Sequence, residues 1–223
     1  MKLRSKVLII AGSDSSGGAG IQADIKTVTA LGGYAMTAIT AVTAQNTKGV
    51  KEIVSIPIKN LQKQIIMVLD DIGVNAVKIG MLHNTEIIKS VHKILKKYNL
   101  KNIVLDPVMF AKGGARLINN NSIKHLKKLL LPLCTLITPN ISEAEVLTGL
   151  SISTKEDMIK AGKKILNMGS KNVLLKGGHL KNKMIFDILV TKKGIKIFPK
   201  RKIKSKNTHG TGCTLSSALA TCL

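Results

Sequence analysis

Short apolar runs rich in β-branched residues alternate along the chain with longer segments in which apolar residues recur every three to four positions. Runs of the first kind are typical of strands buried on both faces, and segments of the second kind are typical of amphipathic helices. Strands are therefore predicted at 6–12, 36–44, 76–80, 101–107, 135–140 and 172–178. Helices are predicted at 20–33, 58–73, 85–99 and 122–132, around residue 143, and across 157–166.

The alternation of strand and helix predicts a mainly parallel sheet with helices on both faces. Two further runs, 184–191 and 194–200, meet at a Lys-Lys-Gly turn and predict an antiparallel pair. The sequence has no internal repeat or low-complexity tract, so a single domain across 1–223 is expected. Ligands of such sheets bind beyond the carboxyl ends of the strands, which is where a functional site is expected.

The amino-acid composition indicates what the core is made of and which partners are disfavoured. Hydrophobic residues make up 44% of the 223 residues, but there is no Trp and there are only two Tyr and three Phe. The core is therefore aliphatic, and the aromatic platforms on which single-stranded nucleic acid stacks are scarce.

The net charge of +23, from 35 Lys and Arg against 12 Asp and Glu, would suit a nucleic acid or an anionic membrane. The basic residues are, however, dispersed over predicted helix faces and turns rather than gathered in one block. This distribution favours a solvated basic surface, or a small anionic substrate, over nucleic acid.

Three cysteines without a C-x-x-C pair are typical of a protein without disulfides in a reducing cytosol. The apolar run near the N-terminus is too short for a signal peptide, and no apolar stretch reaches the roughly 18 residues of a membrane span. A cytoplasmic protein that does not bind membranes is expected.

The loop after the first predicted strand, GSDSSGGAGIQAD, is rich in glycine. Gly18, Gly20 and Ala23 fit the dinucleotide pattern G-x-G-x-x-A, but the second strand ends near Gln45 and carries no acid for a ribose, and no Gly-Lys-Ser/Thr appears anywhere. The loop can be an ordinary strand-to-helix turn. Asp24, one helical turn further on, could face the same strand ends.

Three polar residues follow the next strand ends. In the segment VLDPVM a predicted strand ends on Asp106, and Asn140 and Glu143 lie at the entrance of the helix in ITPNISEAEVLTG. Each admits a purely structural interpretation, as a helix cap or as acids on a helix dipole. The functional alternative is a set of oxygen ligands for a hydrated Mg²⁺ beside phosphate.

The last two loops suit anions. Lys176 ends a strand before a Gly-Gly pair and could contact a phosphate as a point charge. Gly210, Thr211, Gly212 and Cys213 present successive backbone N–H groups at a predicted helix N-terminus, which predicts an anion hole. Cysteine at that place is either a small buried apolar residue or a thiol whose pKa the helix lowers.

These motifs together resemble the hydroxymethylpyrimidine/phosphomethylpyrimidine kinase branch of the ribokinase-like superfamily. The matching segments are IAGSDSSGGAGIQADIKT, AITAVTAQNT, KIGML, VLDPVM, ITPNISEAEVLTG, VLLKGGHL and NTHGTGCTLSSALA, which run from residue 9 to 220. The resemblance implies a ribokinase-like three-layer αβα sandwich and a homodimer. It also implies phosphorylation of 4-amino-5-hydroxymethyl-2-methylpyrimidine, and then of its monophosphate, with ATP and Mg²⁺.

The resemblance also implies roles for individual residues. Gln45 and Asp24 would read the aminopyrimidine edge, in a pocket lined by Gly12, Met81 and Val108. Nucleotide phosphates and Mg²⁺ would be held by Asp106, Asn140, Glu143, Lys176 and Thr211, with Asp106 and Glu143 on the metal. The transferring phosphoryl group would rest on Gly210, Thr211 and Gly212, and Cys213 would stand where most ribokinase-like enzymes carry an aspartate base.

Alternatives remain open at this point. A pyridoxine or pyridoxal kinase of the same fold would act on a similar hydroxymethyl heterocycle, although Gln45 and Cys213 disfavour it. A basic nucleic-acid-binding protein would use the net charge but would leave the five strand-end loops unexplained. The family continues with further helices beyond the last matching segment, so the sequence is expected to be either a fragment of a longer protein or a kinase domain shortened at its C-terminus.

Overall fold

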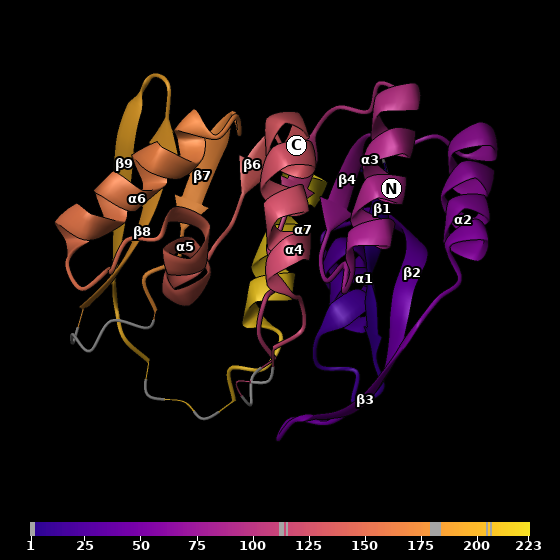
Figure 1. Ribbon diagram of the computed structural model, residues 1–223, viewed down its shortest axis with the longest axis horizontal. Coiled ribbons are helices and arrows are strands. Elements are labelled where there is room, and N and C mark those ends of the chain that lie inside the picture. Colours follow the sequence, from indigo (N-terminus) through magenta and orange to yellow (C-terminus); the bar gives the residue numbers. More distant parts are fainter. Residues whose placement is uncertain (1–2, 112–113, 115, 179–183, 204, 206) are drawn as a thin grey trace.

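The computed structural model describes residues 3–111, 114, 116–178, 184–203, 205 and 207–223. Within them a nine-stranded sheet has the order β3-β2-β1-β4-β5-β6-β7-β8-β9 (Figure 1). The strands are β1 Lys6–Asp14, β2 Tyr34–Gln45, β3 Val50–Ser55, β4 Ala76–Ile79, β5 Ile103–Leu105, β6 Leu136–Ile137, β7 Asn172–Leu175, β8 Met184–Thr191 and β9 Gly194–Arg201. The six strands from β2 across to β7 are parallel, and β3, β8 and β9 pair antiparallel.

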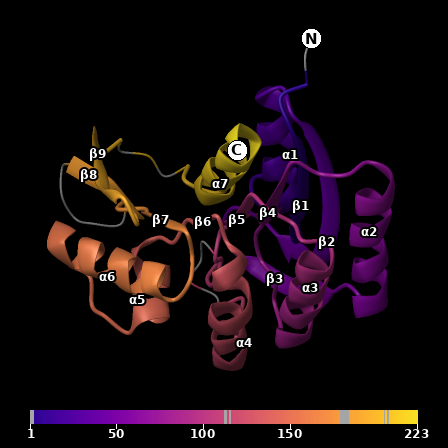
Figure 2. The same ribbon diagram turned by 90° about the horizontal axis from the view of Figure 1, so that it is seen from above.

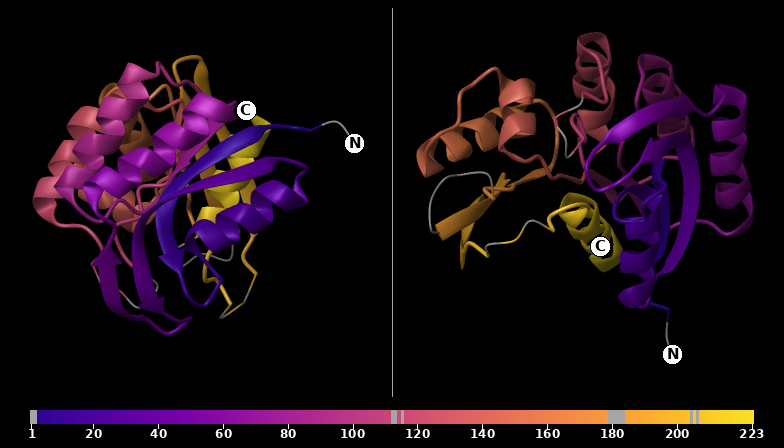
Figure 3. Two further views of the ribbon diagram at one scale, coloured as in Figure 1. Left: turned by 90° about the vertical axis from the view of Figure 1, so that its right-hand side faces the viewer. Right: turned by 90° about the horizontal axis from the view of Figure 1, so that it is seen from below.

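Helices cover both faces of this sheet, as the alternation of elements predicts. The helices are α1 Gly20–Ala30, α2 Ile58–Asp71, α3 Thr85–Lys97, α4 Asn120–His125, α5 Ile141–Thr148, α6 Lys155–Asn167 and α7 Thr211–Cys222. Figures 2 and 3 show α1 and α7 side by side on one face and α2 to α6 on the other. The prediction of a three-layer αβα sandwich with a mainly parallel sheet is therefore confirmed.

The core is aliphatic, and most of its side chains form two layers, one on each face of the β-sheet. The larger cluster packs β-strand residues against α2 to α6, and the smaller one packs Val7 and Ile9 of β1 against Ile21, Val28 and Ala220 of α1 and α7. Because β1 is buried on both faces, its apolar run is continuous rather than alternating.

Two elements differ from the sequence prediction. Strand β3 was not predicted, because its six residues include exposed Lys51 and Glu52 and it pairs only at the sheet edge. The helix predicted at 122–132 begins at Asn120, and the chain continues as a π-helical turn over Leu126–Leu130 and a 3₁₀ turn over Leu131–Leu133. No helix in the described part of the chain is long and apolar enough to cross a bilayer.

Candidate active site

A cavity of about 970 Å³ lies at the carboxyl ends of the parallel strands and is closed on one side by the start of α7. In the sheet, β2 lies on one side of β1 and β4 lies on its other side, so the direction of strand order reverses at β1. The cavity lies at this reversal, where ligands of such sheets bind. All five strand-end loops predicted to carry chemistry contribute to its wall. The lining includes Gly12, Gln45, Met81, Asp106, Val108, Asn140, Glu143, Lys176, Gly210, Thr211, Gly212 and Cys213.

The backbone at the start of α7 has the conformation that the predicted anion hole needs. Gly210 is the N-cap of the helix and has φ +79°, a left-handed conformation that glycine adopts without strain. A Cβ at Gly210 would collide with the carbonyl oxygen of Gly18. Glycine at 210 therefore lets α7 begin directly against the glycine-rich loop. The N–H groups of the first helical turn have no acceptor inside the helix. That of Thr211 makes a long bond of 3.5 Å to the carbonyl oxygen of Thr208, and those of Gly212 and Cys213 are available to an anion.

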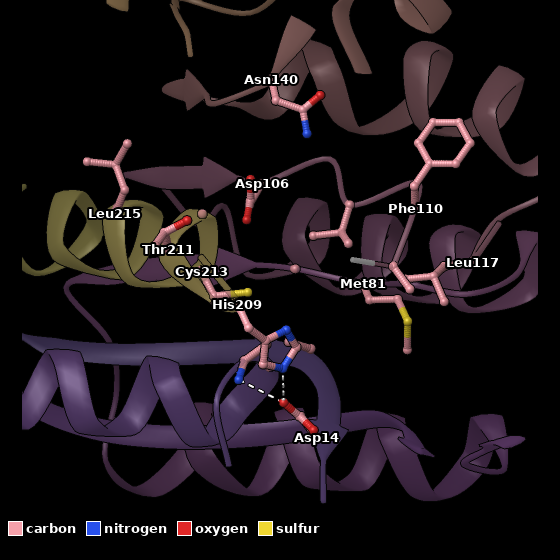
Figure 4. Close-up of a pocket in the computed structure, with 18 of the residues that line it drawn as sticks. Asp14, Met81, Asp106, Phe110, Leu117, Asn140, His209, Thr211, Cys213 and Leu215 are labelled. Atoms are coloured by element: carbon pink, nitrogen blue, oxygen red, sulfur yellow. Dashed lines mark hydrogen bonds and ion pairs between the residues drawn. The ribbon is translucent and has the colours of Figure 1, made fainter. Parts of the chain in front are cut away.

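A hydrogen bond joins the two loops that form this hole. Nε2 of His209 donates to Oδ2 of Asp14 at 2.7 Å (Figure 4). Asp14 also accepts from the backbone N–H groups of Ser16 and Ala19. Burial raises the pKa of Asp14, but the hydrogen bonds from His209 and Ser16 outweigh it and leave this pKa below its usual value. The ionised carboxylate thus fixes His209 at the rim of the cavity.

On the other side of the cavity lies a compact charged cluster. Nζ of Lys176 is 3.0 Å from Oδ1 of Asp106, which also accepts a hydrogen bond from Thr138. Asn140 and Glu143 form a capping box at the start of α5, in which each side chain accepts from the backbone N–H of the other. The structural interpretation of this pair is therefore correct, and it holds both side chains at the cavity wall.

Two carboxyl groups of this cluster could take part in holding a cation. Burial and the nearby Asp106 carboxylate raise the pKa of Glu143 to about 7, and Lys176 opposes them. Two carboxyl groups that disfavour each other's charge are stabilised by a divalent cation, and oxygen ligands suit Mg²⁺. Among the described residues no three His, Cys, Asp or Glu side chains converge into a closed metal site, so waters and phosphate would complete the coordination of an ion held here.

The opposite end of the cavity is apolar. Met81, Phe110 and Leu117 gather there in Figure 4, and Val108 packs in the same cluster. A Cβ at Gly12 would lie 2.5 Å from the Met81 methyl group, so glycine leaves room for that side chain.

Gln45 brings an amide to this region. It lies at the end of β2 and lines the cavity, and its Oε1 accepts from Thr43 at 3.1 Å. The side-chain NH₂ group of Gln45 is the donor left for a ligand.

Asp24 does not lie where the resemblance places it. It is fully buried in α1 and absent from the cavity wall, and both its carboxylate oxygens accept from Nζ of Lys78, at 2.8 and 2.7 Å. Ser217 of α7 donates to the same carboxylate at 2.7 Å. These three bonds occupy the group, so the structure does not support a contact between Asp24 and a ligand in the cavity.

The thiol of Cys213 is not activated in the way its helix position suggests. Burial raises its pKa to about 11, and Asp24 and Asp106 add to this, while Lys78 and the backbone N–H of Gly20 oppose it. Of the two interpretations that the sequence leaves open for this cysteine, the raised pKa favours a small, partly buried residue over a thiol activated by the helix. At neutral pH Cys213 is a protonated thiol at the mouth of the anion hole.

The sequence prediction missed Lys78, Asp14 and His209 as site residues. Lys78 carried a signal, since a lysine inside the otherwise apolar run AVKIG must be buried and paired. The hydrogen bond between Asp14 and His209 joins residues 195 positions apart and left no local pattern to read.

Comparison with known proteins places this geometry in a family. The family model described as phosphomethylpyrimidine kinase matches residues 14–223. The chain is 46% identical over 215 residues to a hydroxymethylpyrimidine/phosphomethylpyrimidine kinase of Bacillus subtilis, a match that covers 96% of this chain and 79% of that protein. It is 50% identical over 220 residues to a thiamine biosynthesis bifunctional protein of Geobacter sulfurreducens, and there it covers 99% of this chain but spans 45% of the relative.

Solved structures give the same result. A phosphomethylpyrimidine kinase of Clostridium difficile is similar at a TM-score of 0.86 and 49% identity, over 97% of this chain and 89% of that one. A pyridoxal kinase of Staphylococcus aureus in complex with AMP-PCP is similar at a TM-score of 0.89 and 36% identity, over 97% and 79%.

Proposed function

The chain belongs to the phosphomethylpyrimidine kinase family, and on that premise we propose that it transfers a phosphoryl group from ATP to 4-amino-5-hydroxymethyl-2-methylpyrimidine. A second transfer to the monophosphate would then give the diphosphate, for thiamine diphosphate biosynthesis. The observation that carries the proposal is the helix N-terminus of Gly210–Cys213 opening onto the same cavity as Lys176 and Gln45.

Phosphoryl transfer needs positioning and neutralisation of charge more than covalent chemistry. The backbone N–H groups of Thr211, Gly212 and Cys213 would hold the oxygens of the transferring group, and Lys176 would neutralise them from across the cavity. Because burial raises the pKa of the Cys213 thiol to about 11, the thiol would serve this hole as a hydrogen-bond donor rather than as a thiolate base.

The nucleotide would lie on the side of Asn140, Lys176 and Thr211, and Asp106 and Glu143 would hold Mg²⁺ with it. The ion supplies charge neutralisation on the phosphates. Glu143→Ala with Asn140→Ala should raise the Mg²⁺ concentration needed for half-maximal activity and leave pyrimidine binding without ATP nearly unchanged. A collapse of that pyrimidine affinity would contradict the assignment, because these side chains would then support the apolar half of the cavity.

The pyrimidine would lie at the apolar end, against Met81 and Val108 and over Gly12. Gln45 would pair with the ring nitrogen and amino group, since a side-chain amide both donates and accepts. The direct test supplies the purified protein with Mg-ATP and either hydroxymethylpyrimidine, its monophosphate or pyridoxine, and identifies products by mass. No phosphorylated pyrimidine in the first two reactions would overturn the proposal.

A second activity on pyridoxal is supported by the similarity to the Staphylococcus aureus pyridoxal kinase, and the third reaction tests it. We further infer a single kinase domain across 1–223, a homodimer and a cytoplasmic location, as family resemblance implies. Light scattering of the purified protein checks the dimer.

A further inference from the structure

A buried ion pair lies beneath the anion hole. Nζ of Lys78, on β4, is 2.7 Å from Oδ2 of Asp24, on α1, and both side chains have an exposed fraction of 0%. Ser217 donates to the same carboxylate from α7. Ser217 lies four residues after Cys213, on the same side of the helix, so the pair is tied to the turn that carries the anion hole.

Stability alone does not account for this pair. Desolvation of two charges largely cancels their attraction, so a buried ion pair is often no more stable than well-packed apolar residues of similar volume. The neighbours of Lys78 on β4, Val77 and Ile79, belong to the apolar core. A methionine at 78 would continue that pattern and need no partner.

The two members of the ion pair lie at different distances from the cavity. Lys78 borders the cavity, whereas Asp24 lies behind it and does not. Gly80 makes room for the ammonium group, because a Cβ there would lie 3.0 Å from Nζ of Lys78. Nζ of Lys78 donates to both carboxylate oxygens of Asp24, and no other acceptor of this ammonium group is found among the described residues. The positive end of the pair thus faces the anion hole.

We propose that the Lys78–Asp24 pair is a positioning device for phosphoryl transfer, which holds the first turn of α7 through Ser217 and directs positive potential into the anion hole. The inference deepens the proposed function and rests on it, since the anion is taken to be the transferring phosphoryl group. Lys78 acts through the hole and does not itself need to contact the substrate.

The Cys213 thiol reports the potential at this place. Four charged groups face it: Asp24 of α1, Lys78 of β4, and Asp106 and Lys176 beyond the ends of β5 and β7. Removing the positive charge of Lys78 should raise the pKa of the thiol, and removing the negative charge of Asp24 should lower it. The two variants therefore shift the thiolate fraction in opposite directions, which general loosening of the fold cannot do.

The first experiment measures the rate at which iodoacetamide alkylates Cys213 at pH 8, read by peptide mass. The background carries Cys222→Ser to remove the exposed cysteine, and Cys134 is fully buried. A change of one pKa unit alters the thiolate fraction about tenfold. Lys78→Met should slow alkylation at least about tenfold and Asp24→Asn should accelerate it about tenfold, on the scale expected for a nearby charge.

The matched control is Lys89→Met, which removes an exposed lysine from α3 on the opposite face of the sheet. It should leave the alkylation rate unchanged. Equal or same-direction changes in the Lys78 and Asp24 variants would overturn the proposal. This readout needs no kinase activity, so it separates failure of the inference from failure of the proposed function.

The second experiment uses the double variant Lys78→Met with Asp24→Asn, which leaves no unpaired buried charge and so tests the idea even where a single variant does not fold. The double variant should keep the wild-type melting temperature and the KM for pyrimidine but lose at least about tenfold in kcat, a modest fraction of what an anion-hole donor contributes. A kcat within twofold of wild type would show that the pair is only structural.

Discussion

Gly210 and Gly32 provide a matched pair for testing the anion hole, because both have φ +79° and only one of them faces the site. Gly32 follows α1, and a Cβ built there meets nothing within 4 Å. A Cβ at Gly210 would instead collide with the carbonyl oxygen of Gly18. Alanine at either position pays the same backbone strain, so the difference between the two variants isolates the collision.

The magnitudes follow from these contacts. An alanine in the left-handed region costs about 1–2 kcal/mol, which lowers the melting temperature of a domain this size by roughly 2–8 °C. Gly32→Ala should show this loss of stability and nothing else. Gly210→Ala should show at least the same loss, and in addition its Cβ must push the start of α7 away from the glycine-rich loop, which displaces the N–H groups that hold the anion. Loss of one such donor typically costs about 10²–10³ in kcat.

Steady-state kinetics with saturating Mg-ATP, together with melting curves, measure both effects. The expected pattern is a kcat that falls about 100-fold or more for Gly210→Ala on the same scale, with pyrimidine affinity retained and Gly32→Ala active. If both variants lose stability equally and keep similar kcat values, the backbone at Gly210 does not hold the transferring group, and the argument for the hole fails.

Three further predictions concern side chains. Cys213→Ser should lower the single-turnover rate of phosphoryl transfer by less than about tenfold and leave the shape of its pH profile unchanged, because one hydrogen-bond donor replaces another. A loss of about 10²–10⁴-fold with a changed pH profile would instead indicate that Cys213 is a general base. Gln45→Ala should weaken pyrimidine use by about 1–3 kcal/mol, the cost of an unpaired buried polar group, and unchanged kcat/KM would exclude its contact with the ring. Folding lowers the pKa of Asp14, so the ionised carboxylate stabilises the folded protein above pH 3.8, and this stabilisation is lost as the pH falls through the lower pKa of the folded state. The Asp14→Asn variant should therefore lose less stability than the wild type between neutral pH and pH 3, as measured by melting curves.

The fold was largely predictable because its signals are local. Each parallel strand is buried on both faces, so a continuous apolar run marks it, and the intervening helices show their period within a few turns. Edge strand β3 shows neither signal, because Lys51 and Glu52 interrupt its apolar residues and no position of the strand is fully buried. Its pairing with β2 is decided by the turn at Asn46, whose side chain accepts from two backbone N–H groups.

The site was predictable to the extent that its residues occupy strand ends. Topology alone brings Asp106, Asn140 and Lys176 to one rim, whatever their side chains do. The hydrogen-bond partners and the burial of individual side chains could not be predicted in the same way. The resemblance implies that Asp24 contacts the substrate, but Lys78 on β4 donates to both oxygens of its carboxylate. Cys213 has the position of an activated thiol, but burial outweighs the helix N-terminus. In both cases a sequence shows which group is present and not how much water surrounds it.

The remaining interactions join segments that are far apart in the chain, and this separation has a mechanistic consequence. Asp14 bonds to His209 across 195 positions, and Asp24 bonds to Ser217 across 193. These bonds connect the end of β1 and helix α1 to α7 and the residues just before it, so each half of the anion hole depends on the other for its placement. α1 and α7 share the smaller of the two main apolar clusters, while α2 to α6 pack in the larger one. A substitution between α1 and α7 should therefore impair phosphoryl transfer before it unfolds the sheet, since the larger core can persist while the two loops separate.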